Sequence, residues 1–91
     1  MGSIYGTVTC GKQPKCNLAS VTTALRLVDI YTNKYLDASV VNGQITPTPV
    51  ARGSYKMKLK CPASNTWKGV TPGNVTIGDA PRRVDVVSNC T

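Results

Sequence analysis

Three lysines at alternate positions form the most regular group of chemically capable side chains in the sequence. Lys56, Lys58 and Lys60 alternate with tyrosine, methionine, leucine and cysteine over residues 54–61. Side chains two apart in a β-strand share one face and lie about 6.5–7 Å apart. The pattern predicts a strand with core residues on one face and a row of ammonium groups on the other. Such a row suits an acidic polysaccharide, a nucleic acid or an anionic membrane surface.

A second interpretation of the row is structural. A solvated sheet face also carries lysines, and they keep an exposed strand edge from pairing with another chain. Four other cations would enlarge the row if they lay on the same face: Lys12, Lys15, Arg26 and Lys68.

The single tryptophan, Trp67, is expected in a polar loop over residues 63–69, next to Lys68. Sugars stack on an indole in loops of this composition, and tyrosines would enlarge such a platform: Tyr5, Tyr31 and Tyr35. The alternative, which we favour from the sequence, is that Trp67 covers one end of the core, because indole burial removes about 150–250 Å² from water. With one tryptophan and no phenylalanine, sequence-specific nucleic-acid binding on an aromatic platform is not expected.

Catalysis lacks the residues that it needs. The chain contains no histidine, so a serine, threonine or cysteine nucleophile would have no imidazole base. The four carboxylates are scattered, at Asp29, Asp37, Asp79 and Asp85. We therefore expect a protein that is not an enzyme and that has no cofactor and no metal site.

Four cysteines in a chain of 91 residues indicate a disulfide framework. They are Cys10, Cys16, Cys61 and Cys90, and none forms the close C-x-x-C pair typical of structural zinc. Cys10 and Cys61 are expected to face inward, and Cys90 lies near the end. We favour a bridge from Cys61 to a terminal strand, while all three pairings of the four cysteines stay open. Disulfides form in oxidising compartments, so we expect a secreted or cell-surface protein; four free thiols or a metal site are the alternatives.

No signal peptide is recognisable in the first residues, so we expect a mature form with an added initiator methionine. No run approaches the roughly 18 apolar residues of a membrane span. Asn74 and Asn89 each begin an N-x-[ST] tripeptide, which is an acceptor for glycosylation in eukaryotic secreted proteins. Arg82-Arg83 is expected in a surface turn, where it is either simply exposed or clamps a carboxylate or phosphate.

Alternation and turn residues predict a single all-β domain over residues 1–91. The expected strands cover residues 3–10, 21–31, 35–41, 44–50, 54–61, 75–77 and 83–89. Asn42-Gly43 is a strong hairpin signal, and Pro47 and Pro49 predict an edge strand or one that leaves the sheet after Thr46. Thr71 to Asn74 is expected to be a turn. About seven short strands with such turns favour an antiparallel two-sheet sandwich, with a small barrel as the alternative.

The strand motifs resemble those of transthyretin-like (prealbumin-like) and carboxypeptidase-regulatory-like β-sandwiches. The resemblance covers most of the chain in order, through Gly6-x-Val8-x-Cys10-Gly11-Lys12-x-Pro14, Leu25-x-Leu27-Val28-Asp29, Asn42-Gly43, Ala51-Arg52-Gly53-Ser54-Tyr55-x-Met57-x-Leu59, Val75-x-Ile77-Gly78 and Val84-x-Val86. The early Cys10 and Cys16 are similar to those of secreted plant cell-wall domains, pollen allergens and nematode transthyretin-like proteins. The resemblance implies the sandwich fold. It does not imply hormone binding or hydrolysis, because those activities rely on residues, histidine among them, that this chain lacks.

Together these features predict a small extracellular binding or structural module without catalytic activity. The contact region would be led by Lys56, Lys58 and Lys60, and the partner would be an acidic glycan or another protein. Two alternatives stay open: a self-assembling subunit of an appendage, capsid or coat that pairs through strand edges, and a secreted effector or inhibitor of a host enzyme that acts through a loop.

Overall fold

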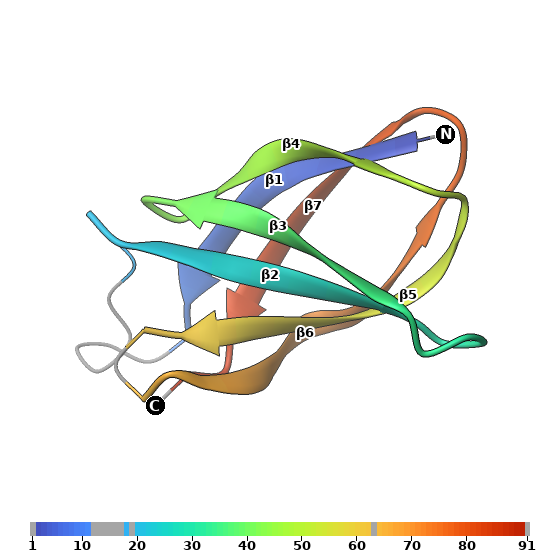
Figure 1. Ribbon diagram of the computed structural model, residues 1–91. Coiled ribbons are helices and arrows are strands. Elements are labelled where there is room, and N and C mark those ends of the chain that lie inside the picture. The colour runs from blue at the N-terminus through green and yellow to red at the C-terminus, as the bar shows by residue number, and fades with distance from the viewer. Residues whose placement is uncertain (1, 12–17, 19, 63, 91) are drawn as a thin grey trace.

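The computed structural model describes residues 2–11, 18, 20–62 and 64–90 (Figure 1). These residues form seven β-strands, and the all-β expectation is confirmed. In chain order the strands are β1 (Gly2–Cys10), β2 (Thr22–Asp29), β3 (Tyr35–Val41), β4 (Gln44–Val50), β5 (Gly53–Cys61), β6 (Thr66–Ile77) and β7 (Pro81–Ser88).

The strands close into a barrel in the order β1-β4-β3-β2-β5-β6-β7. Strands β2, β3 and β4 are consecutive hairpin arms, and β5 returns to lie beside β2, which is a Greek-key arrangement. The terminal strands β1 and β7 complete the ring in parallel, and the other neighbours are antiparallel. The strand pairing therefore closes a barrel where we expected two separate antiparallel sheets.

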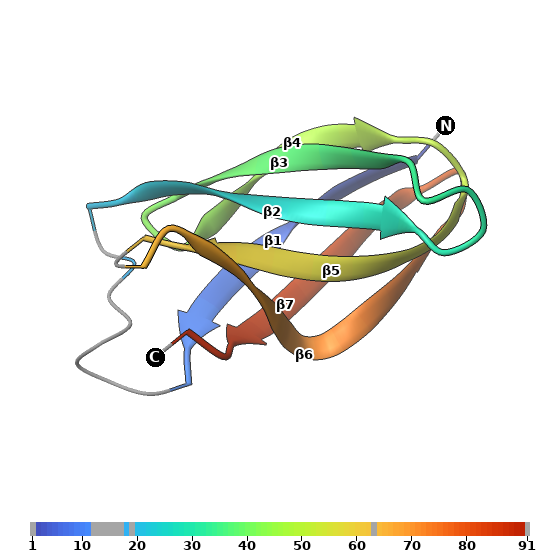
Figure 2. The same cartoon turned by 60° about the horizontal axis from the view of Figure 1, so that its bottom comes forward.

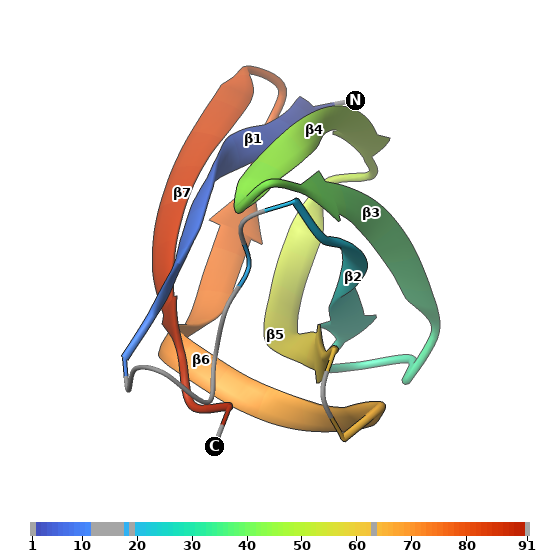
Figure 3. The ribbon, with the colours of Figure 1, turned by 90° about the vertical axis from the view of Figure 1, so that its left-hand side faces the viewer.

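Two of the seven ladders that close the barrel are very short. β3 pairs with β4 at Val40↔Ile45 and Val41↔Gln44, and β6 pairs with β7 at Val70↔Ser88 and Thr71↔Val87. These short ladders separate the longer-paired groups β4-β1-β7 and β3-β2-β5-β6, which curve around the core from opposite sides (Figure 3).

Prolines account for one of the short ladders. Pro47 and Pro49 have no N–H to donate, and β4 parts from β3 just before them. On its other side β4 stays paired with β1 as far as Gly2↔Val50. The expectation that this strand leaves the sheet after Thr46 is therefore wrong, because β4 stays paired with β1. Beyond Ile45, however, β4 pairs on one side only, as an edge strand does.

Local turn chemistry sets the β3–β4 hairpin, whose arms coincide with the expected strands. Asn42 and Gly43 both have positive φ, at 52° and 76°, as a type I′ turn requires. In the β2–β3 connection, the Asp29 carboxylate accepts hydrogen bonds from the backbone N–H groups of Tyr31 (2.8 Å) and Thr32 (3.1 Å).

The expected turn at residues 71–74 and most of the expected loop at residues 63–69 are wrong. β6 begins at Thr66 and continues to Ile77. Its register with β5 shifts between Lys56↔Asn74 and Lys58↔Gly69, so β6 carries extra residues opposite Met57 and bends strongly there. The Pro-Gly pair in this bend breaks the ladder without ending the strand.

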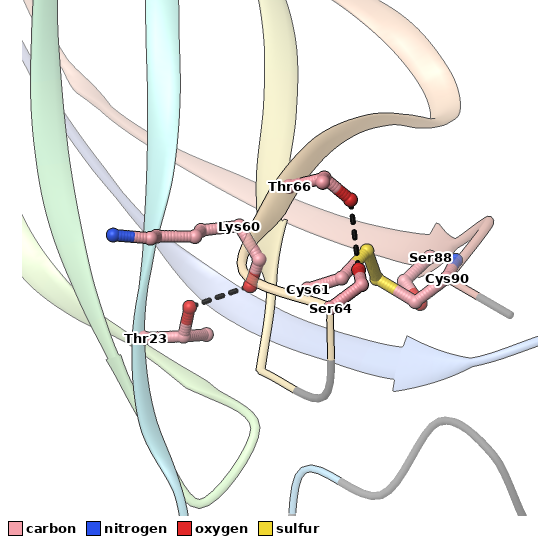
Figure 4. Close-up of a disulfide and its surroundings, with 7 residues drawn as sticks. All are labelled: Thr23, Lys60, Cys61, Ser64, Thr66, Ser88 and Cys90. Carbon is pink, nitrogen blue, oxygen red and sulfur yellow. Dashed lines mark hydrogen bonds between the residues drawn. A yellow bond between two sulfur atoms is a disulfide. The ribbon is translucent and has the colours of Figure 1, made fainter.

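Inward-facing residues of all seven strands meet in one hydrophobic core. Its largest fully buried side chains are Ile4, Leu25, Leu27, Met57, Leu59, Val40, Val50, Val86 and Cys61, and the polar Ser88 is also fully buried. The Cys61–Cys90 disulfide, with a Cα–Cα distance of 5.6 Å, ties the end of β5 to the segment after β7 (Figure 4). Cys10 is also disulfide-bonded, and Cys16 lies outside the described residues.

Arg82 and Arg83 lie in β7 and not in a turn. Arg83 pairs with Asp85 at 3.1 Å, and the Thr7 hydroxyl donates to the same carboxylate at 2.9 Å. These hydrogen bonds lower the pKa of Asp85 below its usual value, and the bond from Thr7 has the largest effect. Arg83 is therefore engaged by a carboxylate of its own strand.

Candidate binding face on β3, β2, β5 and β6

The lysine row lies where the sequence predicted it, on the outer face of β5. Lys56 and Lys58 are exposed and Lys60 is half-buried, while the residues between them are buried. Figure 4 shows the Lys60 and Cys61 side chains extending in opposite directions, the lysine toward β2 and the cysteine toward Cys90. The Thr23 hydroxyl of β2 donates to the Lys60 carbonyl at 2.6 Å (Figure 4). We call Lys56, Lys58 and Lys60 the cationic row.

Arg26 extends the cationic row sideways onto β2, because it lies directly opposite Lys58 in the β2–β5 ladder. On its other side it faces Asp37 of β3. Its guanidinium forms a two-point contact with that carboxylate, Nε to Oδ1 at 2.9 Å and Nη2 to Oδ2 at 3.1 Å. The hydrogen bond to Asp37 raises the pKa of Arg26 above its usual value. Arg26 therefore keeps its charge and has a fixed orientation.

Two aromatic rings stack on the Arg26 guanidinium. Its Cζ lies 3.9 Å from the ring centroid of Tyr35 on β3 and 4.1 Å from that of Trp67 on β6. Both distances are well within the roughly 6 Å of a cation–π contact. Arg26 on β2 thus connects two residues of β3 with the indole on β6. We call Arg26, Asp37, Tyr35 and Trp67 the arginine stack.

Trp67 lies on the outer face and not at the end of the core. It is opposite Lys60 in the β5–β6 ladder, it is half-buried, and it belongs to a strand. The favoured expectation of a tryptophan covering the core is therefore wrong. The predicted combination of an aromatic side chain with the cationic row on one surface is found, because the strand register brings them to the same face.

Other expected members of the site lie elsewhere. Lys68 is opposite the core-facing Leu59, so it is exposed on the other side of the sheet from Trp67. Tyr5 belongs to β1, and Tyr31 projects from the β2–β3 turn with 83% exposure. Lys12 and Lys15 fall outside the described residues.

Sequence reasoning named Tyr35 as a partner of Trp67 but missed its contact with Arg26, and it missed the role of Asp37 entirely. A signal was present, because the hairpin centred near Asn33 sets the cross-strand pairs of β2 and β3 and places Arg26 opposite Asp37. The contact with Trp67 had no such signal, since it depends on how β6 pairs with β5.

The face carries excess positive charge. Arg26 and Asp37 neutralise each other, whereas the ion pairs between described residues do not include the cationic row. Strands β3, β2 and β5 lie side by side as one continuous curved surface in front of β1 and β7 (Figure 2). An extended anion can therefore contact the three lysines and the arginine stack at the same time.

The described residues hold no cluster of three or more His, Cys, Asp or Glu side chains suited to a metal ion. Among these residues there is also no helix with the length and apolar character needed to cross a membrane. Comparisons with protein-family models, curated proteins and solved structures found no match to this chain.

Proposed function

We propose that this protein is a small extracellular binding module, without catalytic activity, that holds an acidic polysaccharide on the outer face of β3, β2, β5 and β6. The observation that carries the proposal is the strand register, which aligns the cationic row with the arginine stack. Ammonium groups attract the anionic groups of the polymer, and Tyr35, which is exposed, and Trp67, which is half-buried, offer apolar contact to its sugar rings.

The disulfides favour a polysaccharide over a nucleic acid as the partner. Cys61–Cys90 and the bonded Cys10 are typical of proteins that work in oxidising, extracellular surroundings, where acidic glycans are common partners. An acidic protein surface would use the same cations, and it is the second partner that we consider. Secretion or display at the cell surface is part of the proposal.

We also propose that the barrel is a distant relative of transthyretin-like sandwiches. The strand motifs of the sequence support this relationship, since Gly6-x-Val8 lies in β1 and Tyr55-x-Met57-x-Leu59 in β5. The two short ladders also divide the strands into two groups, β4-β1-β7 and β3-β2-β5-β6, which correspond to the two sheets of a sandwich.

A matched pair of charge variants tests the proposed function. Replacing Lys56, Lys58 and Lys60 by alanine lowers the formal charge from +7 by three, and so does replacing Arg52, Arg82 and Arg83. The measurement is the affinity for dextran sulfate over a range of salt concentrations. We expect the lysine variant to lose roughly tenfold or more at low salt and to show a shallower salt dependence, because fewer counterions are released on binding.

The arginine variant is the control for net charge. Arg82 and Arg83 lie in β7 and Arg52 lies in the β4–β5 turn, so none of the three belongs to the cationic row or the arginine stack. We therefore expect an affinity within about threefold of the unmodified protein. Equal losses in the two variants would mean that dextran sulfate responds to overall charge and not to the cationic row, and the proposal would then be wrong.

Self-association is a second candidate function, favoured by one observation. β3 pairs with β4 only at residues 40–41, so the edge of β3 over residues 35–39 faces the proline-containing part of β4 without a ladder. A strand from a second copy could pair there. This candidate predicts assembly that grows with protein concentration and survives high salt, which sedimentation velocity measures.

A further inference from the structure

A pocket lies at the Lys56 end of the cationic row. It has a volume of about 310 Å³ and lies between β5, β6 and the residue that follows β2. Its lining consists of Ile30, Ser54, Tyr55, Lys56, Asn74, Val75 and Thr76. We call it the Lys56 pocket.

Four polar side chains form the floor of the Lys56 pocket. Ser54 lies opposite Thr76, and Lys56 lies opposite Asn74, in the β5–β6 ladder. Tyr55 and Val75 between them are buried in the core, so the four polar side chains share the outer face. Opposite residues lie about 5 Å apart and alternate residues about 7 Å apart. The floor therefore has about the footprint of a single sugar ring.

Ile30 supplies an apolar wall beside this floor. Its side chain is 44% exposed. Its backbone N–H donates to the Ser54 carbonyl at 3.1 Å, and this bond fixes Ile30 at the rim of the pocket. The pocket thus combines one apolar wall, one ammonium group, one amide and two hydroxyls.

This set of groups selects the chemistry of a ligand. Hydroxyls and amides both donate and accept hydrogen bonds, as neighbouring hydroxyls of a sugar do. The single ammonium group only donates, and it matches one carboxylate. A sulfate-rich group would call for more than one cation, whereas three of the four floor residues are neutral. Ile30 matches the C–H face of a sugar ring. The best fit is a uronate, a sugar ring with one carboxylate and several hydroxyls.

We propose that the Lys56 pocket holds one uronate unit of the acidic polysaccharide, an inference that rests on the proposed function. Lys58 and Lys60 follow along β5 at intervals of about 6.5–7 Å, and Trp67 lies opposite Lys60. The rest of the polymer therefore runs along β5 from the pocket toward the arginine stack.

Two charge-neutral triple variants test this inference. The pocket variant carries Ser54→Ala, Asn74→Ala and Thr76→Val. The control variant carries the same types of change outside the pocket and outside strands β3, β2, β5 and β6: Ser20→Ala, Asn89→Ala and Thr46→Val, all at exposed positions. Production in a bacterial periplasm allows disulfides to form and leaves the Asn74 tripeptide without a glycan. Calorimetry then measures the affinity of each protein for a uronate trisaccharide and for dextran sulfate.

We expect the pocket variant to bind the trisaccharide about tenfold or more weakly than the unmodified protein, because up to three hydrogen bonds are lost. The control variant should stay within about twofold, and both should bind dextran sulfate almost unchanged, since no charge is altered. If the pocket triple does not fold, Asn74→Ala and its control Asn89→Ala replace the two triples.

The two probes separate the possible failures. If the unmodified protein binds dextran sulfate but not the trisaccharide, or if both variants lose trisaccharide binding equally, the pocket inference is wrong and the proposed function stands. If the unmodified protein binds neither probe, the proposed function itself is wrong.

Discussion

At the scale of single residues, Tyr55 connects the core to the turn that precedes β5. Its ring is 4% exposed, and its hydroxyl donates to the Ala51 carbonyl at 2.7 Å. A tyrosine that bonds back to the backbone a few residues upstream is a recurring feature of Greek-key β-proteins. Burial is the main cause that raises the pKa of Tyr55 above its usual 10.0, and the nearby negative charge of Asp29 adds a smaller increase.

Tyr55→Phe should lower the free energy of unfolding by about 1 kcal/mol at neutral pH, because one hydrogen bond is lost. At alkaline pH the difference should shrink. In the unfolded chain the Tyr55 hydroxyl ionises as the pH rises past 10.0, whereas in the folded protein it stays neutral to a higher pH. The stabilisation that Tyr55 contributes is therefore lost as the pH rises from 10.0 through the higher folded-state pKa. Urea denaturation at neutral and alkaline pH measures both effects. Parallel alkaline losses in the two proteins would contradict the assigned pKa shift.

Residue types alone predicted the cationic row but not the arginine stack. The alternation around Lys56, Lys58 and Lys60 is local, and any strand there produces a row. The stack requires Trp67 to reach Arg26 across two strand pairings, and one of these depends on the irregular β5–β6 register. Contacts that cross such an irregularity are set by the whole fold and leave no trace in a short stretch of sequence.

At the scale of elements, Gly6 sits where β1 changes register against β4 and runs beside β7. Its φ of +142° is rare for residues with a side chain, and a Cβ there would overlap the Val84 carbonyl. Gly6→Ala should therefore lower the free energy of unfolding by at least about 2 kcal/mol. The control is Gly69→Ala, where no atom lies within 4 Å of the added Cβ and the change should stay within about 0.5 kcal/mol. Equal urea midpoints for the two variants would contradict this assignment.

The elements differ in how far the sequence could predict them. The β3–β4 hairpin coincides with its expected bounds, because Asn42-Gly43 fixes the turn by its own backbone preferences. β6 was expected to be a loop, a turn and a short strand, because proline and glycine at positions 72 and 73 are typical of turns. In the barrel the two sides of β6 pair with different strands, β5 and β7, and this tertiary pairing overrides the local preference.

At the scale of the whole molecule, strand alternation predicted the all-β class and the cysteine count predicted disulfides, whereas a closed barrel was only the alternative to the favoured sandwich. A chain of 91 residues buries a small core, so additional links are expected. The parallel β1–β7 ladder, by contrast, joins the two ends of the chain. No local signal marks such a pairing, because its partners lie almost the full length of the sequence apart.

The Cys61–Cys90 disulfide should stabilise the whole barrel. It joins residues 29 apart in the sequence, and closing a loop of this size contributes about 3–4 kcal/mol, mainly by restricting the unfolded chain. The bridge also holds the segment that follows β7 beside the β6–β7 ladder, which has only two residue pairs, at Val70↔Ser88 and Thr71↔Val87.

The double variant Cys61→Ala, Cys90→Ala should therefore unfold at much lower urea concentration, and the amides of Val70 and Thr71 should exchange faster with solvent. Affinity for dextran sulfate should be unchanged under conditions in which the variant stays folded, because the cationic row lies on the outer face of β5. A loss of stability below about 1 kcal/mol, compared with the expected contribution, would mean that the core and the remaining ladders hold the barrel closed without this bridge.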